Sequence, residues 1–419
     1  MHEYGSCMKK PVRKGVTQIM DMKYREILTG DRPLGKYPLH LLKRVDSPTN
    51  KYAGEITRRD PDETAFDRAA NGEYGEEIAD LIKKFHGREP LLASFVSLQT
   101  HLAKFGLPPV AEEKAPIPED ARILTRHIKA LAYFAGADMA GICRLPQSAL
   151  YLRTEERDPI ECDLSYAIVL LNVKHTDTIR SSYGREWIDD PTSFAVYQRS
   201  ACQAQVIAGY IRRLGWAAET SIFDKYLTVM PQLIIEAGLG EESRMGIALN
   251  PFVGSAFKTS AVLTDLPLEA DKPIDFGLQD YCSNCKICAE QCPTRAISFG
   301  DKELYNGYEA WPLKYRNCVT GVVTNKTGNI CERCIKICPW NRPDNRPENF
   351  REWDGNVRFL HDSVNRQAGR LRANGYREPE EYTDKWWFPL LYADGSLIDA
   401  PEFDYAELDR RLAAMKKDR

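Results

Sequence analysis

The chain has 419 residues, which is too long for one ordinary domain and long enough to bury a large core. Its formal net charge is −3, with acidic and basic residues interspersed, so no global field would recruit nucleic acid or an anionic membrane. No apolar run approaches the length of about 18 residues that a membrane span needs, and the N-terminus lacks the apolar segment of an export signal. We therefore expect a cytoplasmic protein with no membrane or nucleic-acid partner.

The first part of the chain is polar and punctuated by proline and charge. Residues 37–45 and 76–85 have the pattern of short amphipathic segments. Residues 108–121 mix proline with glutamate, which is typical of an exposed connector. We interpret 1–120 as an N-terminal extension that packs on the core.

From residue 121 the pattern predicts strands and helices in alternation. Residues 121–142 carry apolar side chains at helical spacing, and 165–173 is a continuous apolar run typical of a buried strand. Ser193 begins a long predicted helix that ends at Gly215, where glycine suits the left-handed residue that follows many helices. Further expected elements are a strand over 217–222, a short helix over 231–240, and strands over 244–251 and 258–268. This alternation predicts a layered α/β core, within a domain over 121–276.

Eight of the twelve cysteines lie in two runs, C-x2-C-x2-C-x3-C-P and C-x12-C-x2-C-x3-C-P. Thiolates at the shorter spacings can hold three corners of a [4Fe–4S] cube. The fourth thiolate, before proline, ligates the other cube in two-cluster ferredoxins. The predicted ligands are Cys282, Cys285, Cys288 and Cys338 for one cluster, and Cys292, Cys318, Cys331 and Cys334 for the other.

Two zinc ribbons are the alternative reading of these runs, because they also use CxxC pairs. Zinc sites stop at four ligands from two pairs, without the third cysteine and the CxxxCP ending. The runs therefore favour a ferredoxin-like domain with two [4Fe–4S] clusters over 277–345. The remaining residues, 346–419, form a C-terminal extension without an assignable motif.

Adjacent clusters relay single electrons, so the core must supply the chemistry or bind a second cofactor. No GxGxxG follows a predicted strand, and no P-loop is present. The chain also lacks DxHxxG, the lower-ligand signature of cobalamin-dependent methyltransferases. Its seven histidines are isolated, with no HxxxH pair.

Three phrases in order resemble the corrinoid-dependent reductive dehalogenases: AGLGEESRMG (237–246), VLTDLPLEADKPIDFG (262–277) and CSNCKICAEQCPTRAI (282–297). RPLGKYPLHLLKRVDSPT (32–49) resembles that family too, especially its cytoplasmic, non-exported branch. The resemblance covers most of the chain and is weakest at 50–110 and 346–419.

This resemblance implies an α/β (α+β) fold with a nitroreductase-like core. The core would bind cobalamin base-off, without a protein histidine below the cobalt, in agreement with the missing DxHxxG. The backbone at Gly246 and Asn250 would touch the corrin, since glycine permits close approach. The family also implies a proton-donating tyrosine over the corrin, with a lysine or arginine beside it. By order and spacing these match Tyr197 and Lys258, and Tyr226 could line the substrate pocket.

The chemistry of this pair is direct. A tyrosine of pKa about 10 is a poor acid near neutral pH. An ammonium group within about 4–6 Å favours the phenolate and lowers that pKa. Lys258 would therefore make Tyr197 a better acid, and it could also hold an anionic substrate. Tyr210 and Tyr226 are the rival tyrosines.

The implied function is removal of halide from an organohalide, such as an ortho-halogenated phenol or hydroxybenzoate, by cob(I)alamin fed from the two clusters. An external ferredoxin or a flavin/ferredoxin-type reductase would supply electrons. Epoxyqueuosine reductases, which act on transfer RNA, share the core over about 160–345 and are the alternative. They use an aspartate as proton donor where this chain has Tyr197, although Asp189 and Asp190 lie nearby. A non-catalytic electron-transfer protein is a third possibility.

Overall fold

The computed structural model describes residues 33–154, 157–325, 330–342, 344–377, 385–387, 390–393 and 396–399. Residues 1–32, on which the expectation of no export signal rests, lie outside the described residues. Arg32, the first residue of the phrase RPLGKYPLHLLKRVDSPT, and much of the predicted C-terminal extension also lie outside them. No helix in the described part of the chain is long and apolar enough to cross a membrane.

A four-stranded antiparallel sheet forms the centre of the molecule, in the order β1-β2-β6-β3. Its strands are β1 (Met139–Arg144), β2 (Tyr166–Val173), β6 (Phe257–Thr264) and β3 (Ala218–Ser221). In the pairing of β2 with β6, Asn172 lies opposite Lys258. This register places Lys258 beside the carboxyl end of β2.

Helices and loops cover both faces of this sheet. Along β2, Ile168 and Leu170 pack into one hydrophobic cluster, whereas Val169 and Leu171 pack into another on the opposite face. Successive side chains of a strand point to opposite faces, so both residue sets of β2 are buried. This explains why its sequence is a continuous apolar run although the sheet is antiparallel.

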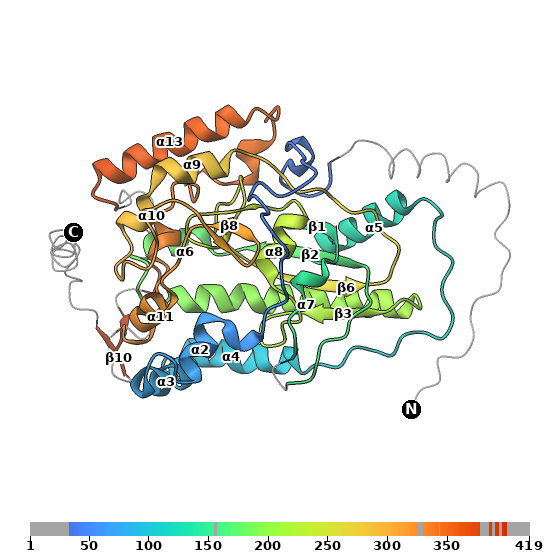
Figure 1. The fold of residues 1–419 in the computed structure, drawn as a ribbon, viewed down its shortest axis with the longest axis horizontal. Helices are drawn as coiled ribbons and strands as arrows, with labels where there is room; N and C mark the ends of the chain where they lie inside the picture. The colour runs from blue at the N-terminus through green and yellow to red at the C-terminus, as the bar shows by residue number, and fades with distance from the viewer. Residues whose placement is uncertain are drawn as a thin grey trace.

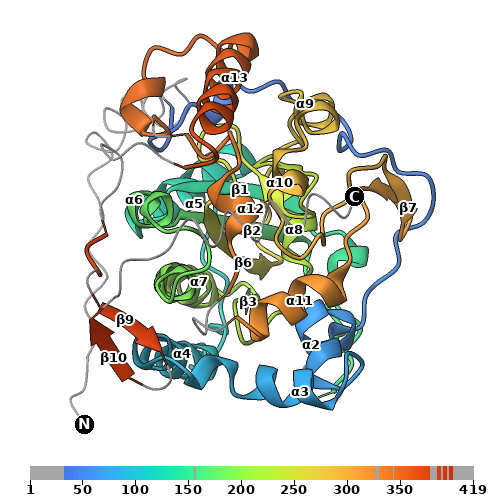
Figure 2. The same ribbon diagram turned by 90° about the vertical axis from the view of Figure 1, so that its left-hand side faces the viewer.

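The longest helix among the described residues, α7 (Asp189–Arg213), lies between the sheet and α4 (Pro90–Ala103) (Figure 2). It shares the cluster of Ile168 and Leu170 with α5 (Ala121–Phe134). The opposite face of the sheet meets α8 (Met230–Glu236). Both views show α9 (Leu278–Cys285) and α13 (Val357–Ala373) on one side of the sheet, with α4 on the other (Figure 1, Figure 2).

Short elements complete the described fold. The short α-helices are α2 (Ala65–Ala70), α3 (Glu76–Lys83), α6 (Thr176–Ser181), α10 (Ile287–Glu290), α11 (Tyr315–Val323) and α12 (Arg333–Lys336). The 3-10 helices are η1 (Leu39–Leu41), η2 (Pro61–Glu63), η3 (Phe85–Gly87), η4 (Gln147–Ala149) and η5 (Pro347–Phe350). The two-stranded pairs are β4 (Glu241–Glu242) with β5 (Ala248–Leu249), β7 (Glu303–Tyr305) with β8 (Tyr308–Ala310), and β9 (Leu390–Ala393) with β10 (Ser396–Asp399).

The predicted mixed helix and sheet fold is confirmed, with three local corrections. The helix expected over 121–142 ends at Phe134, and its last residues form strand β1. The long helix begins at Asp189, four residues before the predicted Ser193, and ends near Gly215, which has φ +84°. The strand expected over 244–251 is only the two-residue β5, because Gly246 turns the chain with φ +68°.

The cysteine-rich segment docks on the core through a close backbone approach at Gly254. A Cβ atom at Gly254, which has φ +63°, would lie 1.9 Å from the Oδ1 atom of Asn341. That oxygen accepts a hydrogen bond of 2.9 Å from the backbone N–H of Ser255. The Asn341 amide also donates to the carbonyl of Ile335. One asparagine thus joins the turn before β6 to the segment that carries the last cysteines.

Replacing Gly254 with alanine tests this docking contact. The variant incurs a left-handed backbone cost of about 1–2 kcal/mol and an overpacking cost of about 1–3 kcal/mol. Gly375→Ala is the matched control, because Gly375 has φ +60° and open space where its Cβ would lie. We expect Gly254→Ala to lower the thermal unfolding midpoint clearly more than Gly375→Ala. Equal shifts would show that the segment accommodates the added methyl group freely.

Candidate active site and cysteine clusters

The two cysteine sets predicted from the sequence each come together. Cys282, Cys285, Cys288 and Cys338 all line one small cavity, together with Tyr281 and Trp340. Cys338 reaches this cavity from the far end of the second run. The exchange of the fourth cysteine between runs is therefore present in the fold.

The second set gathers beside α11 and α12. Electrostatic interactions of the Cys334 thiol with Cys331, Cys318 and Cys292 of its own set, and with Cys288 of the first set, raise its pKa, after the larger effect of burial. Cys318 likewise interacts with Cys331 and Cys292. Proximity of four thiols in a low-dielectric setting makes their simultaneous ionisation costly unless a cation is present. This donor set fits a metal–sulfur cluster, which needs thiolate ligands.

A buried arginine fastens the first cysteine loop to the core. Arg244 is 2% exposed and lies two residues after the end of β4. Its guanidinium donates hydrogen bonds to backbone carbonyls at the start of the first cysteine run and just after its end, those of Cys282 (2.9 Å), Ser283 (3.3 Å), Ser298 (2.9 Å) and Gly300 (2.9 Å). It also lies close enough to Cys282 and Cys288 to lower the pKa of both thiols, against the larger opposing effect of burial.

Sequence reasoning included Arg244 in a family phrase but gave it no role. Its partners are carbonyls up to 56 residues away, so no local pattern could reveal them. Four fixed donors in a rigid fork suit this task, whereas a lysine could not reach the same set.

The predicted catalytic pair, Tyr197 and Lys258, is adjacent in the fold. The Lys258 Nζ atom lies 4.9 Å from the centroid of the Tyr197 ring, and the two side chains interact electrostatically. Burial lowers the pKa of Lys258, but Tyr197, Glu332 and Asp190 together raise it above its ordinary value. Lys258 is therefore an ammonium at neutral pH, and its charge faces the phenol.

Aromatic side chains surround Tyr197. Its ring centroid lies 4.5 Å from that of Phe223 and 5.7 Å from that of Phe194. Burial is the main cause that raises the pKa of Tyr226, and its electrostatic interaction with Tyr197 raises it further. Both candidate tyrosines pack against Phe223. Sequence reasoning missed Phe223, which precedes Tyr226 in an irregular loop without a periodic signal.

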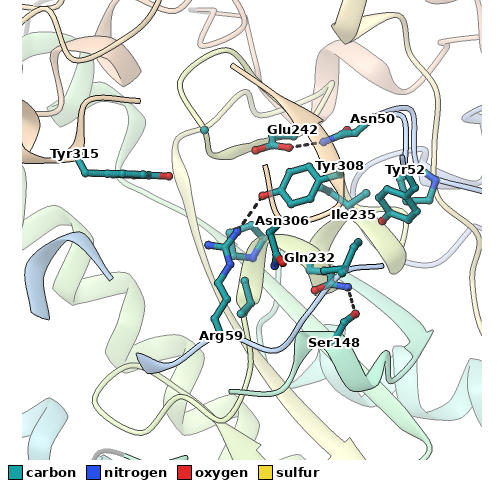
Figure 3. Close-up of a pocket in the computed structure, with 15 residues that line it drawn as sticks. Asn50, Tyr52, Arg59, Ser148, Gln232, Ile235, Glu242, Asn306, Tyr308 and Tyr315 are labelled. Carbon is teal, nitrogen blue, oxygen red and sulfur yellow. Dashed lines mark hydrogen bonds between the residues drawn. The ribbon is translucent and has the colours of Figure 1, made fainter. Parts of the chain in front are cut away.

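Figure 3 shows a second cavity of about 90 Å³, and Gly246 contributes to its lining. Its polar contacts pair side chains across the cavity: Asn50 donates to Glu242, Arg59 to the Tyr308 hydroxyl at 3.1 Å, and Gln232 to Ser148 at 2.8 Å (Figure 3). Val229 and Pro231 also line it, a few residues after Tyr226. Tyr226 lines a different cavity, together with Arg212 and Asp224.

Asn250 and Tyr210 have structural roles in the described residues. Asn250 is fully buried, and its amide donates to the carbonyl of Leu239 at 2.7 Å. Its Oδ1 accepts from the N–H groups of Phe252 and Val253. Asn250 therefore stabilises the turn between β5 and β6, and it does not line the cavity around Gly246. Tyr210 lies farther along α7, where its hydroxyl is 2.9 Å from the Nε2 atom of His127.

Comparison with known proteins finds a match to the cysteine-rich segment and relatives of the longer chain. Residues 281–342 match the family model of the 4Fe-4S dicluster domain. The tetrachloroethene reductive dehalogenase of Sulfurospirillum multivorans is 27% identical over 350 residues, which is 74% of this chain and 66% of that protein. The enzyme of the same name from Dehalobacter restrictus is 31% identical over 209 residues.

Solved structures give the same result. The catabolic reductive dehalogenase NpRdhA is 34% identical, with a TM-score of 0.78 over 91% of this chain and 56% of that one. The chain is a homologue of the reductive dehalogenases. Like them, it is related to epoxyqueuosine reductases, and that of Leadbetterella byssophila is 29% identical over 133 residues. The chain therefore spans about two thirds of the length of the Sulfurospirillum multivorans enzyme and about one third of the length of the Dehalobacter restrictus enzyme.

Replacing Arg244 with lysine tests the role of this residue at the first cysteine set. The charge is kept, but most of the four carbonyl contacts are lost. We expect the variant to retain less iron than the unaltered protein, with the loss confined to one of two electron paramagnetic resonance signals. Arg59→Lys, in the cavity of Figure 3, is the control and should retain full iron. Equal loss from both signals would indicate general unfolding instead.

Proposed function

We propose that this homologue is itself a reductive dehalogenase, an oxidoreductase that replaces a carbon–halogen bond with a carbon–hydrogen bond. The observation that carries the proposal is the position of Lys258, 4.9 Å from the Tyr197 ring, inside a mainly aromatic wall. An acid of this kind serves a reaction in which carbon takes up a proton.

Two [4Fe–4S] clusters would be held by the two cysteine sets, within a domain over 277–345. Cobalamin would be held base-off in the domain over 121–276, with Gly246 permitting its close approach. When bound and reduced, cobalamin supplies the electrons that break the carbon–halogen bond, and the clusters supply its electrons one at a time. Residues 1–120 and 346–419 would be extensions of these two domains. An external ferredoxin or a flavin/ferredoxin-type reductase would be the electron donor.

The residues of this chain would handle the proton and the substrate. Tyr197 gives its phenolic proton to the carbon from which halide departs. Lys258 stabilises the phenolate that remains, since an adjacent ammonium favours the charged form. Phe194 and Phe223 keep water from the ring face, and Tyr226 lies beside Tyr197 across Phe223.

An aromatic substrate with an acidic group, such as an ortho-halogenated phenol or hydroxybenzoate, fits this wall. Its ring would stack on Phe223 or Tyr226, and its anionic oxygen would approach Lys258. NpRdhA has been solved in complex with 3-bromo-4-hydroxybenzoic acid and is 33% identical to this chain.

Reconstituted protein should contain about eight iron and eight sulfide per chain, because each [4Fe–4S] cube takes four of each. It should also bind one cobalamin, without nitrogen splitting from a protein histidine in the cob(II)alamin resonance signal. Metal analysis and electron paramagnetic resonance test both points. About four iron per chain, zinc in place of iron, or a cobalt–histidine signal would contradict the proposed cofactor set.

Tyr197→Phe should keep both cofactors and lose dehalogenation by a factor of roughly 10²–10⁴, because only the acidic proton is removed. Lys258→Arg should be milder than Lys258→Ala, since the charge stays. Tyr210→Phe, on the same helix, is the control and should retain activity. Halide release from a bromophenol or bromohydroxybenzoate series measures all four variants.

Near-normal halide release by Tyr197→Phe with full cofactor loading would transfer the donor role to Tyr226. Reduction of epoxyqueuosine in transfer RNA, with no activity on any organohalide, would identify the homologue as an epoxyqueuosine reductase. Cofactor binding without either activity would leave electron transfer as its function.

A further inference from the structure

One face of α7 carries a column of polar side chains that the proposed reaction uses only in part. Asp190, Ser193 and Tyr197 are spaced by three and four residues, so they lie above one another on the helix. Lys258 on β6 faces the Tyr197 end of this column. Lys174, directly after β2, and Glu332, directly before α12, face its Asp190 end.

Most of these groups are satisfied by one another. Lys174 and Glu332 are 3% and 2% exposed and form an ion pair. The Ser193 hydroxyl donates to the same carboxylate at 3.0 Å. Neighbouring Asp189 accepts a hydrogen bond from the N–H of Glu186 at 2.7 Å.

Asp190 is the exception. It is 3% exposed, and its Oδ2 atom is buried without a hydrogen-bond partner among the described residues. A buried carboxylate without a partner is costly, whereas a carboxylic acid at the same position avoids most of that cost. The geometry therefore favours a proton on Asp190.

The surrounding charges set how firmly that proton is held. Burial raises the pKa of Asp190, and the carboxylates of Glu332 and Glu89 raise it further, while Lys258 and Lys174 lower it. The outcome is a pKa of about 7. Asp190 can therefore both hold and release a proton near neutral pH, which an ordinary aspartate cannot do.

The proposed reaction needs such a group. Each turnover removes one proton from Tyr197 and leaves a phenolate in an aromatic, half-buried wall. A new proton must arrive before the next substrate can react. Lys258 lies 4.9 Å from the centroid of the Tyr197 ring, and it interacts electrostatically with both Tyr197 and Asp190.

We propose that Asp190 is the proton reservoir that restores Tyr197 after each turnover, acting through Lys258. The Lys258 ammonium gives a proton to the Tyr197 phenolate, and the Asp190 carboxylic acid gives its proton to the lysine amine through one bridging water, a reach that proton transfer allows. The products are a tyrosine phenol, a lysine ammonium and an aspartate carboxylate. Asp190 then regains a proton from water, and no electron moves in these steps. Asp190 does not contact the substrate, and the inference rests on the proposed function.

Asp190→Asn tests this relay by separating the first turnover from later ones. The substitution keeps the shape of the side chain and removes its acid. With prereduced holoenzyme and a bromophenol, the first turnover should stay within about twofold of the unaltered rate, because Tyr197 begins protonated. The steady-state rate should fall by at least about tenfold, within the range of proton-transfer catalysis.

The pH profile provides a second readout. The unaltered steady-state rate should decline as pH rises through about 7, because Asp190 then loses the proton that it donates. This decline should vanish in Asp190→Asn and persist in Asp265→Asn. Asp265 is the matched control, because its Oδ1 atom is also buried without a partner, but it lies beyond the other end of β6.

An infrared titration measures the acid without any turnover. The unaltered holoenzyme should show protonated carboxyl C=O bands that disappear near neutral pH, one from Asp190 and one from Glu242, whose pKa burial also raises to about 7, and Asp190→Asn should lack the Asp190 band alone. Absence of the Asp190 band from the unaltered protein would overturn the proposal, even if Asp190→Asn does not fold. An unchanged steady-state rate in Asp190→Asn would also overturn it and leave the dehalogenase function standing. Failure of the unaltered protein on every organohalide would overturn both proposals together.

Discussion

The buried ion pair between Lys174 and Glu332 is the contact on which the arrangement of the site depends. Lys174 extends the central strand β2, whereas Glu332 stands between two cysteines of the second set. Both side chains are nearly inaccessible to water, so neither charge is tolerated without the other. Removing one partner of such a pair typically costs about 3–5 kcal/mol. The pair therefore fixes where the cysteine-rich segment meets the sheet.

This attachment decides which side chains can act together. The carboxylate of Glu332 accepts a hydrogen bond from Ser193, so α7 is held at the same point. The register of β2 with β6 then places Lys258 one strand away from Lys174. Tyr197 lies one helical turn beyond Ser193 and meets Lys258 there. The second cysteine set and the proposed catalytic pair are thus both positioned against one helix.

Arginine side chains of the core also place positive charge beside both cysteine sets. Thiolate-rich clusters are anionic, and burying them requires nearby cations or hydrogen-bond donors. Arg244 serves the first set and lies 4.8 Å from the Trp311 ring. Arg185 lowers the pKa of Cys331 in the second set, against the larger effect of burial. Both arginines belong to the core. Their charges can therefore stabilise the clusters only when the cysteine-rich segment is docked on the core.

The sequence by itself determined the features that depend on short spacing. The Cys-x2-Cys runs and their prolines predicted the dicluster match, and the apolar run at 165–173 predicted β2. The end of helix α7 was predicted closely, because Gly215 lies at the point where the chain leaves the helix. Tyr197 and Lys258 came from family resemblance, since nothing local distinguishes them from a packed tyrosine and a surface lysine.

Only the tertiary structure decided the rest, because the decisive contacts join residues far apart in the chain. Strand β1 has an apolar pattern that continues the preceding helix, and only its pairing with β2 makes residues 139–144 extended. Arg244 and Asn341 find their partners across the boundary between core and cysteine segment. Asp190 is an ordinary aspartate in sequence. Its affinity for a proton arises from burial and from charges on four other elements, which no local pattern contains.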